Sequence, residues 1–336
     1  MSCSGTVGRT AFVRNDMHGM ALTHDVIRIA GQPDRAFPGY LFAFLTSAPA
    51  QAMIHQHTYG SVVQHIEPHH LADLPVPLPD APMQRRIHNL VEAAAAKRTE
   101  ASGLLDKASA YFDAQMEPFR YLHEHALATT IINRSALRRG RLDAFSHCGW
   151  SAEAAGMQGD RLGSLAEVAR PGIIKRLFAE RGIPFVSGVD VYQLRPSART
   201  RLRSDEAVRS DALISAGQIL VQRSGQRYGL LGRPAYVGQR LNGWASSDHL
   251  MRIDPHDPAM TGHLFALLRS EAGRRQLVGQ SYGTSIPAIN PQLLAAITVP
   301  PLPSDLVDNA NRALRLREEA DADEERAIQE VEAWLS

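Results

Sequence analysis

The sequence predicts an α+β protein made of two related globular units, each followed by a long helix. Three observations lead to this fold class. The chain contains an internal repeat, a proline-rich segment closes each copy, and an amphipathic helical pattern follows each of those segments. A chain of 336 residues is also long enough for about two domains, each with a core of its own.

The internal repeat relates the two halves of the chain. Short segments recur in the same order, interrupted only by one or two small deletions. The matching pairs are Gly8–Val13 with Gly232–Val237, Val26–Ile29 with Leu250–Ile253, Gly39–Ala43 with Gly262–Ala266, Tyr59–Ser61 with Tyr282–Thr284, and Leu74–Pro77 with Ile297–Pro300. Chance does not produce so many ordered matches, so the chain is a tandem of two related units.

Both copies predict the same order of elements. A strand pair punctuated by glycine comes first, then an alternating strand, a short apolar helix, a loop with another short strand, and the proline-rich segment. Proline at that density fits neither a helix interior nor a central strand, so each such segment marks a domain edge. The expected ranges are 4–13 and 217–237 for the strand pair, 24–29 and 248–253 for the single strand, and about 38–50 and 260–272 for the helix.

A long amphipathic helix is expected after each proline-rich segment. Apolar or small residues recur at steps of three and four, and Arg98 is the one charged exception in the first helix. These positions are Ile87, Val91, Ala94, Ala101, Leu105, Ala108 and Phe112, then Ala313, Ala320, Ala327, Val331 and Trp334. Alanine-rich seams allow close approach, so the simplest arrangement pairs the two helices. The alternative is that each helix lies on its own globular unit.

Several ordered motifs carry a resemblance to a known family. They are Ser4–Arg9, Leu71–Pro79 leading into Gln84–Ile87, Arg141–Ala144, Gly217–Val221 with Ser224–Gly225, and the segment 297–303. In this order they resemble the DNA-specificity subunit of type I restriction-modification systems, over nearly the entire chain.

The resemblance implies a function and partners. In that family each globular unit is a target-recognition domain that recognises one half of a bipartite site in double-stranded DNA. The helices pair into an antiparallel coiled coil, which sets the spacing of the half-sites and docks DNA methyltransferase subunits. Partner subunits use S-adenosylmethionine for adenine methylation, and a restriction subunit uses ATP and Mg, so this chain is expected to bind no cofactor and to catalyse nothing. The alternative function is a non-catalytic coiled-coil adaptor that binds DNA without sequence preference.

The resemblance also divides the chain into parts. We expect the C-terminal part of a first recognition domain (1–81), a central helix region (82–136), a second recognition domain (137–303) and a C-terminal helix (304–336). The counterpart of about 143–224 is missing from the first copy. A start further upstream, a degraded gene and completion by another chain each explain this.

Basic residues in the second unit predict the DNA contacts. Residues 195–240 carry nine arginines against three acids, which is an electrostatic footprint for phosphate. Only three of the 36 basic residues of the chain are lysines; arginine suits phosphate and guanine, although a GC-rich genome produces the same bias. The side chains expected at DNA are Lys175, Arg176, Arg199, Arg201, Arg203, Arg223, Gln226, Arg227, Tyr228, Asn242, Trp244, Ser246, Thr284 and Ser285.

Two kinds of contact are expected within this set. The alternating Arg199, Arg201 and Arg203 suit phosphates, whereas base recognition is expected from the loops 224–229, 242–247 and 281–285. A merely solvated basic face is the alternative for the arginines, and core packing is the alternative for Trp244 and Tyr282.

Other functional classes find no support in the sequence. Neither a cysteine nor a paired carboxylate completes a ligand set around His55, His57, His65, His69 and His70, so surface or DNA-edge histidines are expected in place of a metal site. Cys3 and Cys148 stand alone. We find no membrane-spanning stretch or signal-peptide core, which predicts a soluble cytoplasmic protein. Methyltransferase, P-loop and nuclease motifs are missing too.

Overall fold

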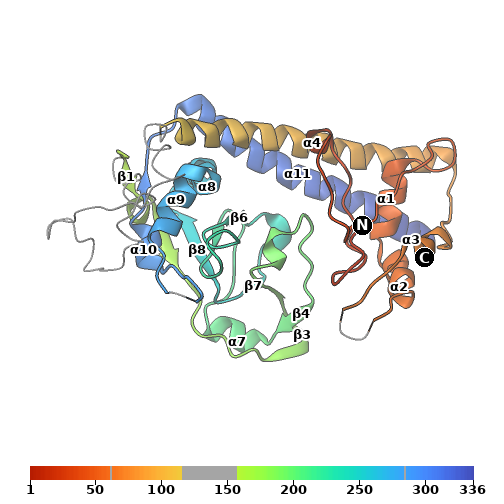
Figure 1. Ribbon diagram of the computed structural model, residues 1–336, viewed down its shortest axis with the longest axis horizontal. Helices are drawn as coiled ribbons and strands as arrows, with labels where there is room; N and C mark the ends of the chain where they lie inside the picture. Colours follow the sequence, from red (N-terminus) through yellow and green to blue (C-terminus); the bar gives the residue numbers. More distant parts are fainter. Residues whose placement is uncertain (61–62, 116–156, 284) are drawn as a thin grey trace. The chain divides into compact units, whose positions relative to one another are not determined.

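Two compact units make up the structure. The computed structural model describes residues 1–60, 63–115, 157–283 and 285–336 (Figure 1). Unit 1 consists of Met1–Ala101 with Arg315–Ser336, and unit 2 of Ser102–Leu314. The two long helices, α4 (Ala81–Ala114) and α11 (Ser304–Leu335), each contribute one part to unit 1 and the other to unit 2. Each globular repeat therefore packs with a piece of both helices.

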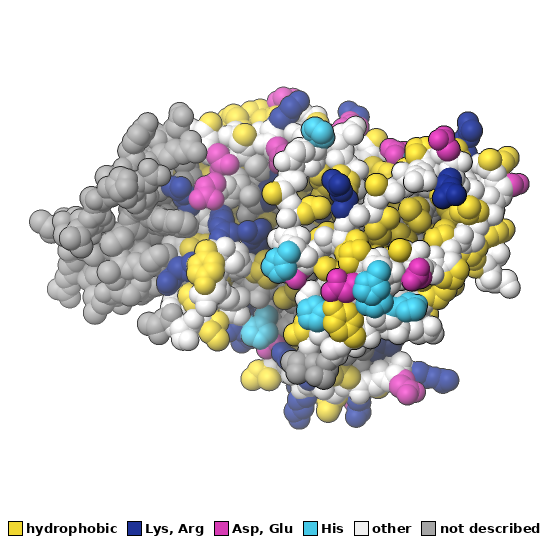
Figure 2. Space-filling view, turned by 45° about the vertical axis from the view of Figure 1, so that its right-hand side comes forward, with side chains coloured by type: hydrophobic (Ala, Val, Ile, Leu, Met, Phe, Trp, Pro, Cys, Tyr) yellow, Lys and Arg dark blue, Asp and Glu magenta, His cyan; other side chains and the backbone are white. Residues whose placement is uncertain are grey.

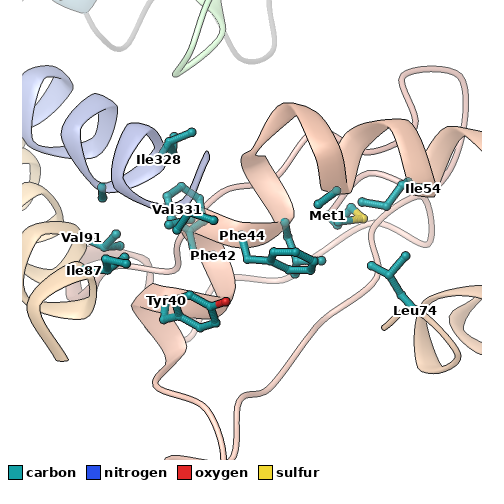
Figure 3. Packing of buried hydrophobic residues seen from close by; sticks show 14 of the residues in the cluster. Met1, Tyr40, Phe42, Phe44, Ile54, Leu74, Ile87, Val91, Ile328 and Val331 are labelled. Carbon is teal, nitrogen blue, oxygen red and sulfur yellow. The ribbon is translucent and has the colours of Figure 1, made fainter. Parts of the chain in front are cut away.

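The globular part of unit 1 is mainly helical. Its described elements are η1 (Asn15–Met17), α1 (Pro38–Thr46), α2 (Ala48–Gln56) and α3 (Pro68–Ala72). In its core, Figure 3 shows aromatic side chains of α1 near Ile87 and Val91 of α4 and near Ile328 and Val331 of α11. All four of these aliphatic side chains are buried, so both long helices belong to the core of unit 1.

Unit 2 combines short helices with small sheets. Its described helices are α6 (Leu162–Leu165), η7 (Asp190–Tyr192), α7 (Ser204–Arg209), η8 (Gln239–Leu241), η9 (Pro258–Met260), α8 (Thr261–Arg269), α9 (Glu271–Gly279) and α10 (Pro291–Ala295). Its described strands are β1 (Asp160–Arg161), β2 (Ala166–Ala169), β3 (Phe178–Val186), β4 (Thr200–Leu202), β5 (Ile219–Gln222), β6 (Pro234–Tyr236), β7 (Ala245–Ser246), β8 (Leu250–Pro255) and β9 (Thr298–Val299).

The described strands of unit 2 form separate sheets. One antiparallel sheet has the order β2-β8-β5-β6, so β8 lies between β2 and β5. A second sheet has the order β4-β3-β7, in which β3 pairs antiparallel with β4 and parallel with β7. Strands β1 and β9 form a third, two-stranded pair.

The two units repeat individual hydrogen bonds, which confirms the tandem repeat at the level of atoms. The Gly39 N–H donates to Nδ1 of His88 at 3.2 Å in unit 1, and the equivalent Gly262 N–H donates to Oδ1 of Asn311 at 2.9 Å in unit 2. Tyr40 bonds the Pro77 carbonyl, and the equivalent His263 bonds the Pro300 carbonyl. The Ile66 N–H donates to the Cys3 carbonyl at 3.0 Å, and the equivalent Ile289 N–H donates to the Arg223 carbonyl at 2.8 Å. A Cβ atom on Gly39 would lie 2.8 Å from the Cα of His88, so only glycine allows this close helix contact.

The predicted apolar helix is in fact two helices in each unit. Helices α1 and α2 meet at Ser47, and α8 and α9 meet at Ser270; both serines have extended backbone angles. Each serine hydroxyl donates to a carbonyl of the preceding helix, from Ser47 to Phe44 and from Ser270 to Leu267, both at 2.6 Å. The hydroxyl thus closes one helix while the backbone turns into the next.

The predicted strands form in unit 2 but not in unit 1. Strands β5, β6 and β8 lie where the pattern of the second copy places them. Among the described residues of unit 1, the corresponding segments meet only in isolated bridges, Ser2 with Val26 and His65 with both Ser4 and Tyr59. The strand prediction for the first copy is wrong because a strand needs neighbours, and unit 1 has no described counterpart of β2.

The seam of the long helices is confirmed, with one exception. Every predicted position of α4 is buried at 2% exposure or less, as are the predicted alanines and Val331 of α11. Trp334 is 40% exposed, so its assignment to the seam is wrong; it stands one residue before the end of α11. In unit 1 the helices run antiparallel, because Arg86 pairs with Glu330 whereas Lys97 pairs with Glu319 and Asp323.

The long helices also bind the first turns of shorter helices. Glu332 of α11 accepts a hydrogen bond from the amide of Ala48, the first residue of α2, at 2.8 Å. In unit 2, Asp113 of α4 accepts one from the amide of Ala272 in the first turn of α9, also at 2.8 Å. A carboxylate at a helix N-terminus satisfies a free N–H group and favours the helix dipole. None of the described helices is both long and apolar enough to cross a membrane.

Candidate nucleic-acid interface

Three arginines form a row along strand β4 in unit 2. Leu202 is fully buried, whereas Arg199, Arg201 and Arg203 are exposed; Thr200 is exposed as well, so burial alternates only around Leu202. The Nη1 of Arg201 donates to the carbonyl of Gly182 on β3 at 3.1 Å, so this side chain lies across the sheet. Arg203 pairs with Asp205 at 2.6 Å, and both side chains are more than half exposed. The row therefore presents cationic side chains to solvent.

The loop before β3 lies beside this row. Lys175 and Arg176 are exposed, and the amide of Lys175 donates to Oε1 of Glu206 at 2.6 Å. Glu206 is buried on α7 and pairs with Arg209. The hydrogen bonds from Arg209 lower the pKa of Glu206, which keeps its carboxylate charged and able to anchor the loop. The predicted residues Lys175 and Arg176 thus share one sheet region with the β4 arginines.

A second group of predicted residues lies on the loop after β5. The amide of Gly229 donates to the carbonyl of Gln226 at 2.9 Å, which closes a tight turn around Arg227 and Tyr228. Tyr228 is 84% exposed, the highest fraction among the large apolar and aromatic side chains that the structure describes. Gln226 is exposed as well. The tip of this loop therefore presents one aromatic ring and one amide to solvent.

Arginine side chains hold this loop in place. Arg227 itself donates to the hydroxyl of Ser281 at 3.1 Å. Arg274 of α9 donates to the carbonyl of Arg227 at 2.6 Å, and Arg233 donates to the carbonyl of Gly229 at 3.1 Å. These contacts fix the loop, and the three arginine side chains also add positive charge to it. Sequence analysis missed Arg274, because no local pattern links it to a loop so far away along the chain.

This loop is longer in unit 2 than in unit 1. Ser4–Gly5 and Ser224–Gly225 are equivalent, since Gly5 donates to the Gln64 carbonyl at 2.9 Å and Gly225 to the Pro287 carbonyl at 3.1 Å. Only residues 6–7 separate Gly5 from the next repeated glycine, whereas residues 226–231 follow Gly225. The exposed tip with Gln226 and Tyr228 is therefore specific to unit 2.

Arg223 and the 281–289 segment support the base of the loop. Arg223 is half-buried; its amide donates to the His249 carbonyl at 2.9 Å, and its side chain to the Asp248 carbonyl at 3.4 Å. Tyr282 forms a backbone bridge with Ala288 and its side chain is 41% exposed. Ser285 is exposed nearby in sequence, and Thr284 lies outside the described residues.

The predicted 242–247 loop contributes little to a DNA surface. Ser246 is completely buried on β7, where its hydroxyl points to the Ala212 carbonyl at 3.4 Å, so the prediction that Ser246 contacts DNA is wrong. Trp244 packs against the core cluster of unit 2, as the alternative interpretation expected. Asn242 is exposed, but its Oδ1 accepts a hydrogen bond from the amide of Ala216 at 3.1 Å.

The rings of His57, His65, His69 and His70 lie near one another or near Tyr59 in unit 1. Figure 2 shows histidine side chains gathered on one face of the molecule, and the rings of His69 and His70 are 4.0 Å apart between centroids. The Nδ1 of His70 accepts the amide of Glu67, so this ring takes part in the N-terminal cap of α3. Within the described ranges, no group of three or more His, Cys, Asp or Glu side chains could hold a metal ion.

The fold defines a tandem α+β protein in which two repeated units share a pair of long helices. Neither a protein-family model nor a curated protein matches the chain. Solved structures do match. An S subunit of a type I restriction-modification system from M. genitalium aligns over 89% of this chain and 71% of its own, at 16% identity and a TM-score of 0.35.

Two further structures give similar values. The HsdS subunit from Thermoanaerobacter tengcongensis aligns over 88% of this chain and 65% of its own, with 16% identity and a TM-score of 0.33. A chain from a structure of the type I R-M system, described for its complex assembly and conformational transition, aligns over 90% of this chain and 70% of its own, with 16% identity and a TM-score of 0.36.

Proposed function

We propose that this protein is a sequence-specific DNA-binding subunit of the type I restriction-modification kind, which directs adenine methylation or cleavage by partner subunits. The observation that carries the proposal is the loop 224–233 of unit 2. Three arginine side chains fix this loop, and its tip presents Tyr228 and Gln226 to solvent. A rigid, cationic loop with an exposed ring and an exposed amide has the chemistry that base recognition requires.

The two groups of residues have different roles in this proposal. Arg199, Arg201 and Arg203 contact phosphates, because exposed arginines on a strand supply charge and hydrogen bonds without choosing a base. Gln226 pairs with adenine through its amide, and Tyr228 packs against a sugar or a thymine methyl group. Arg227 and Arg274 add positive charge to the loop and favour its approach to DNA.

The partners follow from the same proposal. The paired helices α4 and α11 offer a docking surface for methyltransferase subunits, which would supply S-adenosylmethionine chemistry. A restriction subunit would supply the ATP- and Mg-dependent step. Support for these partners comes from the motifs of the sequence and from the type I complex named among the matching structures.

Mapping of methylated adenines tests the proposal. DNA from cells that carry the gene should show methylation at a split sequence that is unmodified in cells without the gene. A chain with Tyr228→Ala should change the preference at one half of that sequence. Leu78→Ala in the proline-rich segment of unit 1, where the leucine side chain is also exposed, is the control and should leave the pattern unchanged. Identical methylation with and without the gene would overturn the proposal.

The alternative function is that of a non-specific adaptor. An adaptor would bind all duplexes equally, and its affinity would vanish at high salt. Competition between duplexes of different sequence therefore separates the two functions.

A further inference from the structure

Helix α9 of unit 2 is attached to the long helix α4 at one point and to the loop 224–233 at another. Oδ1 of Asp113 on α4 accepts a hydrogen bond from the amide of Ala272 in the first turn of α9 at 2.8 Å. Two residues further along α9, Arg274 donates to the carbonyl of Arg227 at 2.6 Å. Less than one helical turn therefore separates the bond to α4 from the bond to the loop.

Unit 1 repeats this arrangement with different side chains. Oε1 of Glu332 on α11 accepts a hydrogen bond from the amide of Ala48 at the start of α2, at 2.8 Å. Gln51 and Arg274 each stand fourth in their helix, and Nε2 of Gln51 donates to the carbonyl of Gly8 at 2.9 Å. Gly8 lies at the end of the short loop that corresponds to the longer loop of unit 2. The connection from long helix to short helix to loop therefore belongs to the repeat and not to one local sequence.

Helix α9 has a cap of its own besides its contact with α4. The hydroxyl of Ser270 accepts a hydrogen bond from the amide of Gly273 at 3.0 Å, which satisfies one free N–H group of the first turn. A Cβ atom on Gly273 would lie 2.0 Å from the carbonyl oxygen of Leu267, so α9 packs directly on the end of α8. What the bond to Asp113 adds is attachment to α4, which fixes the helix and, with it, the guanidinium of Arg274.

We propose that Asp113 is a positioning residue for DNA recognition, which sets the orientation of the loop 224–233 through α9 and Arg274. A carboxylate suits this role, because a charge-assisted hydrogen bond at a helix N-terminus is stronger than a neutral one. The consequence for DNA rests on the proposed function of the loop. The effect on the loop itself does not, so the two can be measured separately.

Amide hydrogen exchange in the full chain without DNA tests the hold on the loop. The amide of Gly229, whose hydrogen bond to the Gln226 carbonyl closes the tip, reports on the loop. The amide of Val237, a fully buried residue, donates to the Gln218 carbonyl at 2.9 Å and is the reference for an intact unit 2. Asp113→Ala should speed exchange at Gly229 roughly fivefold relative to Val237, because the loop opens more often when α9 is free of α4.

Matched variants identify the route of the effect. Asp113→Asn should keep exchange in the loop within roughly twofold of the unmodified chain, because its side-chain oxygen still accepts the Ala272 amide. Arg274→Ala should speed exchange in the loop as well, and Asp113→Ala added to it should cause no further change, since both act through one contact. Asp106→Ala, which removes a partly exposed ion pair between α4 and Arg269, is the control and should leave exchange unchanged.

Competition between duplexes measures the consequence for DNA. The ratio of target to non-target affinity should fall roughly threefold in Asp113→Ala and stay within roughly twofold of the unmodified chain in Asp113→Asn. An unmodified chain that binds all duplexes equally would contradict the proposed function. Exchange at Gly229 would still decide the role of Asp113 in that case.

Three results would overturn the proposal. Unchanged exchange at Gly229 in Asp113→Ala would show that α4 does not hold the loop. Faster exchange at Gly229 and Val237 together, or failure of this variant to fold, would make Asp113 a structural residue of unit 2 as a whole. Additive effects of Asp113→Ala and Arg274→Ala would show that Asp113 acts by a route other than Arg274.

Discussion

Arg98 of α4 and Glu324 of α11 form an ion pair inside unit 1, where both side chains are almost completely buried, at 5% and 1% exposure. Asp321 accepts a further hydrogen bond from Arg98 at 2.6 Å. Burial alone would lower the pKa of Arg98, but the hydrogen bonds and charges of Glu324 and Asp321 raise it. The one charged residue in the seam of α4 thus has its partners on the facing helix.

Removal of one member of this pair should destabilise unit 1. Glu324→Ala leaves a buried cation without its main partner, which costs about 3–5 kcal/mol of unfolding free energy. The double variant Arg98→Met with Glu324→Leu should be neutral or stabilising, because apolar side chains then fill the seam. Urea unfolding measures both. Glu330→Ala, which removes the partly exposed pair with Arg86, is the control and should cost less than about 1 kcal/mol. An equal loss in Glu324→Ala and Glu330→Ala would contradict this reasoning.

The β4 arginines should determine the salt dependence of DNA binding. Replacement of Arg201 and Arg203 by alanine removes two phosphate contacts, so the slope of log K against log salt should fall by about two in magnitude. Binding of a mixed-sequence duplex is measured at several salt concentrations. Lys107→Ala, a loss of one exposed cation on α4, is the control and should leave the slope unchanged. An unchanged slope in the double variant would place both arginines away from the phosphates.

Arg274 should act as a positioning residue for the loop that carries Tyr228. Arg274→Ala removes the hydrogen bond to the Arg227 carbonyl, so the loop tip loses its fixed orientation. The ratio of target to non-target affinity should fall about tenfold, equal to about 1.4 kcal/mol, while the salt slope changes little. Competition between duplexes measures the ratio. If Arg274→Ala lowers both affinities equally, the residue contributes charge and not position.

His263 should make unit 2 sensitive to acid. Burial lowers the pKa of His263 below its usual 6.5, although the hydrogen bond to the Pro300 carbonyl acts in the opposite direction. Because the folded pKa lies below the unfolded value, the stabilisation is complete above about pH 6.5 and decreases as the pH falls through the folded pKa. Urea unfolding between pH 7.5 and pH 5, at about one-half unit steps, measures the loss.

Unit 1 has a tyrosine at the position equivalent to His263, and exchanging the two residue types gives two variants for this pH measurement. Tyr40 occupies the equivalent position in unit 1 and bonds the equivalent carbonyl with a group that stays neutral in this range. His263→Tyr should therefore reduce the loss of stability on acidification, and Tyr40→His should introduce such a loss in unit 1. The same pH dependence in His263→Tyr and the unmodified chain would exclude His263 as its source.

The long-range organisation of this fold could be predicted, because the sequence patterns that indicate it do not depend on which segments pack together in space. Residues spaced by three and four determine the buried face of a helix, and all predicted α4 positions are buried. The repeat similarly fixed which segments correspond. The division of the apolar helix at Ser47 could not be predicted, since a serine inside an apolar run is compatible with a helix until its backbone angles are known.

The remaining failures concern contacts between distant segments. Val26–Ile29 has a strand pattern equal to that of β8, but only β8 has described neighbours on both sides. Ser246 lies two residues after Trp244 in a polar run, so its sequence resembles that of a loop. It is buried nevertheless, because β7 pairs with β3. For the candidate site, the sequence could name the β4 arginines and Tyr228, which are exposed, but their contact with DNA stays a prediction, and Arg274 required the fold.

The bond between Ala48 and Glu332 has a consequence for synthesis of the protein. Ala48 is made early, but the carboxylate that binds its amide belongs to one of the last residues of the chain. At about 5–20 residues per second, the ribosome needs many seconds to travel from one to the other. During that time the core of unit 1 lacks Ile328 and Val331, and its apolar side chains remain uncovered. The unit that is translated first is therefore the one that completes its folding last.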